Sequence, residues 1–104
     1  MKKLSYEQIT VSMRRSAELC SDVAREAFDS LNFSLGFSQE GQAVALFFAW
    51  RSLLYHNHIS IPVDDYRDFH DLVYVHQPSK PAISEDFLSQ FCGFAQKKEL
   101  KEAA

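Results

Sequence analysis

Apolar side chains recur at steps of three and four residues between residues 9 and 31. They are Ile9, Met13, Ala17, Cys20, Ala24, Ala27, Phe28 and Leu31, and charged residues occupy most of the other side. This period is typical of an amphipathic helix. The preceding segment SYEQ matches a capping box, in which the Ser5 hydroxyl and the Gln8 amide satisfy free backbone N–H groups. The pattern predicts a helix over residues 5–31.

The segment NFSLGF, residues 32–37, interrupts this period. Gly36 can adopt the positive φ that a turn needs. Phe33, Leu35 and Phe37 alternate with small residues. We expect either a short extended segment that packs over the core or an apolar surface loop that a partner covers.

The most apolar part of the chain follows. Ser38 has the properties of a helix N-cap, and Glu40 lies in the first turn, where the helix dipole favours an anion. From Ala43 to Tyr55 almost every residue is apolar. A helix of this kind lies at the centre of a fold or in a subunit interface. Asn57 tolerates a left-handed C-cap, so the pattern predicts a central helix over residues 38–56.

Two more helices are predicted beyond Pro62. Asp64 and Asp65 indicate the start of a helix over residues 64–76, with a short strand at 73–75 (VYV) as the main alternative. The connector QPSKP, residues 77–81, cannot continue a helix. Ser84 then caps a last helix over residues 84–100. A chain of 104 residues fits one domain, and we expect an all-α single domain of four helices.

Composition limits the possible functions. Nine Phe, four Tyr and one Trp are many rings for a chain of this size, so we expect a homodimer that buries some of them. A net charge of −3 without a Lys/Arg cluster argues against nucleic-acid and anionic-membrane partners. The apolar run from Ala43 to Trp50 is too short to span a bilayer. Cys20 and Cys92 are expected to be free thiols in a reducing compartment, and we expect a soluble, cytoplasmic protein.

Motifs for a metal or cofactor are weak. Four His, at positions 56, 58, 70 and 76, lie near four Asp, at positions 64, 65, 68 and 71, and borderline metals favour this combination. No His pair has the i, i+4 spacing of a helical metal site, and His70 and His76 lie on different faces of one predicted helix. The scattered glycines form neither a phosphate loop nor a dinucleotide fingerprint. We therefore predict neither a metal nor a cofactor.

One short motif has an enzymatic interpretation. The segment RSLLYH, from Arg51 to His56, resembles the Arg-x4–6-His motif of the HEPN ribonucleases, a family of helical and usually dimeric proteins. The resemblance implies a metal-independent ribonuclease in which Arg51 and His56 of two protomers converge on the scissile phosphate. On a continuous helix the two side chains point about 140° apart, so they face one pocket only if the helix ends between them.

The interpretation we favour is protein recognition. Large rigid rings bury much area at a low entropic cost, which is why they anchor interfaces. The candidate partner-binding residues are Phe33, Leu35, Phe37, Phe47, Trp50 and Tyr55. Aromatic residues at helical spacing also form cores, and this alternative stays open here. The sequence therefore predicts a small intracellular regulator, adaptor or inhibitor that binds another protein through an apolar helical surface.

Overall fold

In the computed structural model, which describes residues 5–76, 78 and 80–92, the first helix is α1 (Tyr6–Asp29). It begins at the predicted capping box. The Gln8 backbone N–H donates to Ser5 Oγ at 3.1 Å, and the Ser5 backbone N–H donates to Gln8 Oε1 at 3.0 Å. Both bonds satisfy N–H groups that have no partner within the helix, so the start of α1 follows directly from four adjacent residues.

The second helix begins earlier than predicted. α2 runs over Phe33–His56, and its N-cap is Asn32, whose side chain accepts from the Leu35 backbone N–H at 3.3 Å. The prediction of an N-cap at Ser38 is wrong, as is the extended segment or loop over residues 32–37. The turn needs only residues 30–32, because Leu31 adopts the left-handed φ of 61° that we had assigned to Gly36.

Gly36 is required for a close approach between helices. It is buried within α2, and a Cβ atom at this position would lie 2.7 Å from Cε1 of Phe28. The ring of Phe28 therefore packs directly on the backbone of α2 where a larger residue would clash. Cβ atoms essentially never lie within 3.0 Å of such an atom, so glycine sets the separation of α1 and α2 at this end.

The other described helix boundaries lie at or within a few residues of the predicted positions. α2 ends at Asn57 as its C-cap, but the left-handed residue is His58, with φ 58°. α3 (Val63–Val73) ends three residues before the predicted boundary, and Tyr74 and Val75 are neither helix nor strand. α4 (Glu85–Phe91) begins at the predicted Ser84 cap, and the rest of its predicted span, residues 93–100, lies outside the described residues.

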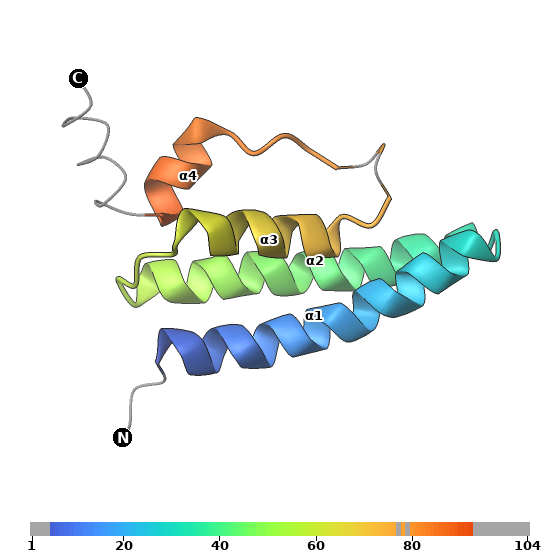
Figure 1. Ribbon diagram of the computed structural model, residues 1–104, viewed down its shortest axis with the longest axis horizontal. Coiled ribbons are helices and arrows are strands. Elements are labelled where there is room, and N and C mark those ends of the chain that lie inside the picture. Colours follow the sequence, from blue (N-terminus) through green and yellow to red (C-terminus); the bar gives the residue numbers. More distant parts are fainter. Residues whose placement is uncertain (1–4, 77, 79, 93–104) are drawn as a thin grey trace.

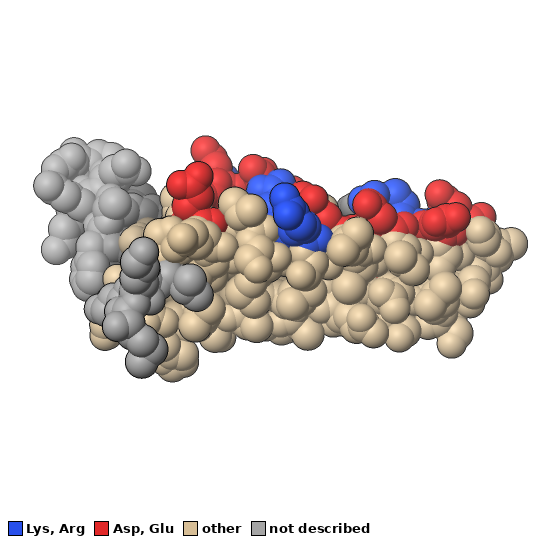
Figure 2. Space-filling model, turned by 90° about the horizontal axis from the view of Figure 1, so that it is seen from below, with Lys and Arg blue, Asp and Glu red and all other residues tan. Residues whose placement is uncertain are grey.

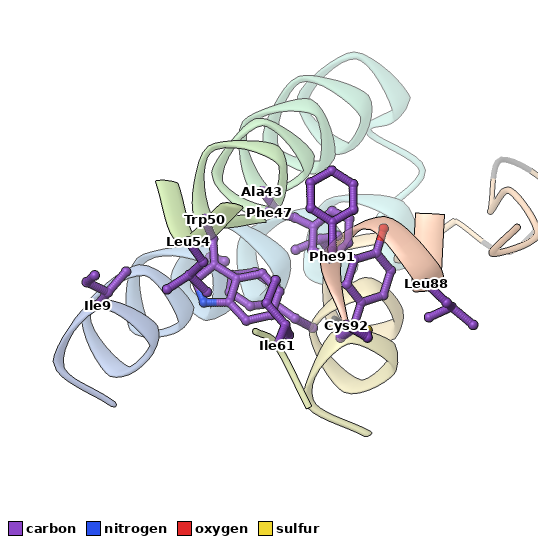
Figure 3. Close-up of a cluster of buried hydrophobic side chains, with 13 residues drawn as sticks. Ile9, Ala43, Phe47, Trp50, Leu54, Ile61, Leu88, Phe91 and Cys92 are labelled. Atoms are coloured by element: carbon purple, nitrogen blue, oxygen red, sulfur yellow. The ribbon is translucent and has the colours of Figure 1, made fainter. Parts of the chain in front are cut away.

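The helices pack around one aromatic core. Figure 1 shows α1 and α2 as a long antiparallel pair with α3 running along α2, and α2 contacts α1, α3 and α4. Buried side chains converge from all four helices and from Ile61 (Figure 3). At the centre, the Trp50 and Phe69 rings lie 4.7 Å apart, and Trp50 Nε1 donates to Thr10 Oγ1 at 2.8 Å. Within the described residues there are four helices and no strand, and none of these helices has the length and hydropathy needed to cross a membrane.

Candidate functional site

The exposed surface of α2 carries no Asp, Glu, Lys or Arg. This helix contains two charged residues, Glu40 and Arg51, and neither is fully exposed. Glu40 is 6% exposed, and its Oε2 accepts from the His76 backbone N–H at 2.6 Å. Arg51 lies among aromatic rings. A solvent-facing helix surface without charge is unusual for a chain in which 24% of the residues are charged.

Charges on α1 gather on one side of that helix. At about 100° per residue, its eight charged residues fall within a sector of about 120°. The exposed residues Ser12, Ser16, Leu19 and Val23 lie next to that sector and are uncharged. Figure 2 shows the consequence: charged side chains gather along one edge of the view, and the other edge has none among the residues drawn in colour.

Small residues form a straight row on the exposed side of α2, which we name the small-residue stripe. It consists of Ser34, Ser38, Gly41, Ala45, Ala49 and Ser52, all exposed. The row advances eighteen residues from Ser34 to Ser52 in five steps, so the mean step is 3.6 residues. This equals the number of residues in one turn of the α-helix, and the row therefore runs parallel to the helix axis. The stripe is not among the features predicted from the sequence, because residues 43–55 read as one apolar block. The recurrence of Ser, Gly and Ala at steps of three and four was the available signal.

Beside this stripe lies a row of rings, which we name the aromatic edge. Phe37, Phe48 and Tyr55 project from α2 within about 20° of one another, and they are 46%, 40% and 45% exposed. Phe33 extends the row at its beginning, and Phe87 of α4 lies beside it, with 53% and 43% exposure. Exposed rings that share one edge are typical of an interaction surface rather than of a solvated helix.

The six predicted partner-binding residues separate into three groups. Phe47 and Trp50 are 1% and 0% exposed, so they belong to the core and offer no surface to a partner in this conformation. Phe33, Phe37 and Tyr55 lie on the aromatic edge. Leu35 is 41% exposed but lies on the opposite flank of the stripe, toward α1. Whether a large apolar residue of α2 belongs to the core or to an exposed surface therefore depends on the face of the helix that carries it.

Among the described residues, Arg51 is held by aromatic rings and not by a carboxylate. Its guanidinium carbon lies 4.4 Å from the ring centroid of Phe48 and 4.9 Å from those of Phe87 and Phe91. Its Nη1 donates to the Tyr66 hydroxyl at 2.9 Å. A guanidinium attracts aromatic faces through their quadrupole. Arg51 therefore attaches α4 to α2 and α3, and it gives one end of the aromatic edge a defined shape.

The two residues of the ribonuclease motif do not come together within one chain. α2 continues without a break to His56, so Arg51 and His56 point in directions about 140° apart. The Arg51 guanidinium lies toward α3 and α4, whereas His56 is exposed beside Tyr55. No contact among the described residues favours a phosphate site between them.

The histidines are dispersed as well. His70 is 4% exposed, and burial lowers its pKa despite Asp71 Oδ1 at 3.7 Å from Nδ1. His76 packs on Phe28 and Phe37, with centroid distances of 5.3 and 5.0 Å. In the part of the chain that the structure describes, no three His, Cys, Asp or Glu residues are grouped so that they can hold a metal ion.

Comparison with known proteins adds no relative: no family model, no curated protein and no solved structure matches this chain. The functional conclusion therefore depends on the surfaces described above.

Proposed function

We propose that this chain is a non-enzymatic protein-binding module, a small regulator, adaptor or inhibitor, and that its partner docks on the aromatic edge. The observation that supports this most strongly is the row formed by Phe37, Phe48 and Tyr55, three exposed rings on a helix whose exposed side lacks charge. We also propose a homodimer that buries part of α2, and a cytoplasmic location.

The energetics favour a partner that covers more than the rings. An aromatic side chain buries about 200 Å² in total, so each half-exposed ring offers about 90 Å² to a partner. At about 25 cal/mol per Å², three such rings contribute about 7 kcal/mol. Association itself costs about 4–15 kcal/mol. The rings are therefore anchors, and a specific complex needs further contacts around them, for example with Phe33 and Phe87.

The test is affinity capture from the native cell with matched variants. Phe37→Asp and Tyr55→Asp each place a carboxylate in the row, and Val11→Asp places one at a 53% exposed position on the charged side of α1. We expect the wild type and Val11→Asp to retain the same partner, and both aromatic-edge variants to lose it with unchanged helicity by circular dichroism. Equal capture by all four proteins would contradict the proposed surface.

Incubation of RNA with the wild type and with His56→Ala tests the enzymatic alternative. A binding module leaves RNA intact. RNA cleavage by the wild type that disappears in His56→Ala would overturn the proposal in favour of the ribonuclease.

A further inference from the structure

The small-residue stripe is part of a larger surface that both long helices share. It lies on the same side of the α1–α2 pair as Ser12, Ser16, Leu19 and Val23, the exposed uncharged residues of α1. α3 packs on the opposite side, where Tyr6 Oη donates to Asp65 and Arg51 donates to Tyr66. We name the combined surface of α1 and α2 the uncharged face. It corresponds to the edge of Figure 2 that has no charged atoms among the coloured residues.

The size of this face matches what a stable dimer needs. Helices of 24 residues are about 36 Å long, and two helices about 9–10 Å apart present a width of about 20 Å. The area of the face is therefore about 700 Å², and a specific protein–protein interface buries about 800 Å² per partner. Crystal-packing contacts bury about half as much per side, so the face is large enough for a specific contact.

Its charge and shape favour a second copy of this chain as the occupant. In a twofold dimer the same surface meets itself, so a face with charges would bring like charges together, and this face has none. A lipid-binding helix surface has Trp, Phe or Leu on its apolar face and Lys or Arg on its polar one. Here Gly41, Ala45 and Ala49 occupy the middle of the α2 surface instead. A shallow row of small residues lets another helix approach closely, because the interaxial distance depends on the side chains at the contact.

The last five residues of the small-residue stripe are arranged symmetrically about Ala45. Ser38 and Ser52 lie seven residues on either side of it, and Gly41 and Ala49 lie four residues on either side. If two α2 helices cross antiparallel at Ala45, Ala45 therefore meets Ala45 of the other copy, Ser38 meets Ser52 and Gly41 meets Ala49, while Ser34 at the end of the stripe lies level with His56. Antiparallel helices also align their dipoles favourably.

The remaining residues of the face fit the same arrangement. Thr10 contacts Trp50 and Cys20 contacts Gln42, so Ser16 of α1 lies level with Ala45. A twofold axis across both helices at this level stacks α1 on α1 of the second copy, with Ser16 at the crossing. A parallel dimer places the two α1 helices on opposite sides and leaves half of the face uncovered. The antiparallel dimer also brings both aromatic edges to the same side of the assembly.

We infer that the uncharged face binds a second copy of this chain, with the two α2 helices antiparallel and crossing at Ala45. The inference rests on the proposed homodimer and specifies its interface. The resulting unit is a four-helix layer of α1, α2 and their counterparts, with α3 and α4 on the outside and with the aromatic edges at the rim of the interface.

Crosslinking and light scattering test this geometry. Ala45→Cys places a thiol at the twofold axis, whereas Ser34→Cys places thiols of the two copies about 33 Å apart along α2, far beyond the Cα separation of about 7 Å that a disulfide tolerates. Both variants retain the native Cys20 and Cys92, and the oxidised wild type sets the background. We expect a covalent dimer on a non-reducing gel for Ala45→Cys only.

A charge introduced into the uncharged face supplies the second measurement. Ala45→Arg keeps an exposed helix position and a good helix former, and Val11→Arg is the matched control on the charged side of α1. We expect light scattering to give twice the 12.0 kDa protomer mass for the wild type and Val11→Arg, and the protomer mass for Ala45→Arg.

Each other outcome overturns a defined statement. Crosslinking of both Cys variants indicates a parallel dimer. A wild-type dimer that Ala45→Cys does not crosslink and Ala45→Arg does not dissociate places the contact elsewhere. Both outcomes refute this inference and leave the homodimer standing. A monomeric wild type refutes the homodimer as well. A monomer that binds phosphatidylcholine vesicles through Ala45 assigns the face to lipid. Partner capture through the aromatic edge is measured separately and is independent of these results.

Discussion

Two glycines in α2 offer a direct test of how closely α1 and α2 pack. A Cβ at Gly36 would lie 2.7, 2.8 and 2.9 Å from three ring atoms of Phe28, whereas a Cβ at Gly41 meets nothing within 4 Å. The Phe28 ring cannot swing away freely, because it also packs on Phe37 at 5.0 Å and on His76 at 5.3 Å between centroids. The same substitution at the two positions should therefore have opposite effects.

The expected magnitudes follow from two contributions. Replacing Gly by Ala within a helix raises the free energy of unfolding by about 1 kcal/mol. Overpacking at Gly36 lowers it by about 1–3 kcal/mol, and the net effect of Gly36→Ala is a loss of about 1 kcal/mol. Gly41→Ala keeps the full gain. The two variants should differ by about 2 kcal/mol, which corresponds to about 10 °C in Tm for a domain of this size.

Thermal and urea unfolding measure this difference. Both substitutions are made in the Ala45→Arg protein, so that the proposed dimer contributes to neither transition. Circular dichroism follows the helical signal, and the parent variant is the reference. If Gly36→Ala is as stable as Gly41→Ala, the close contact between Phe28 and the α2 backbone does not exist, and our account of the α1–α2 separation is wrong.

Three further predictions concern individual side chains. Arg51→Lys keeps the charge but loses the contacts of the guanidinium with four aromatic rings and the bond to the Tyr66 hydroxyl, so urea titration should show a loss of about 1–2 kcal/mol in the free energy of unfolding. An unchanged midpoint contradicts the role of Arg51 in attaching α4. Burial lowers the pKa of His70, so the unfolded chain binds protons more readily than the folded one, and stability should be fully present above about pH 6.5 and fall below it. His70→Gln should weaken this pH dependence of the free energy of unfolding. Equal pH profiles for the wild type and His70→Gln would contradict the prediction. Burial raises the pKa of Cys92 to about 11, so one thiol, Cys20, should react rapidly with Ellman's reagent at pH 8, and two fast thiols in the native protein would refute the burial of Cys92.

The sequence predicts the structure correctly where an interaction between neighbouring residues determines it. The capping box at Ser5 and the cap at Ser84 are formed by residues three positions apart, so their sequence signatures suffice. The helical period of residues 9–31 likewise predicts α1. These features depend on hydrogen bonds and side-chain directions within a single helix, and no distant contact alters them.

Tertiary contacts decided the role of the most apolar segment. Composition cannot assign Trp50 to the core and Phe48 to the surface, because both are large and aromatic and only two positions apart. The assignment depends on where α3 packs, and that position is set by contacts between residues far apart in the chain. Gly36 shows the same limit: its lack of a side chain fits a turn equally well, and only the ring of Phe28 reveals that the glycine permits a close approach. The sequence by itself therefore determined that residues 38–56 form a helix rich in aromatic residues. The packing of the other helices decided which of its faces remain available to a partner.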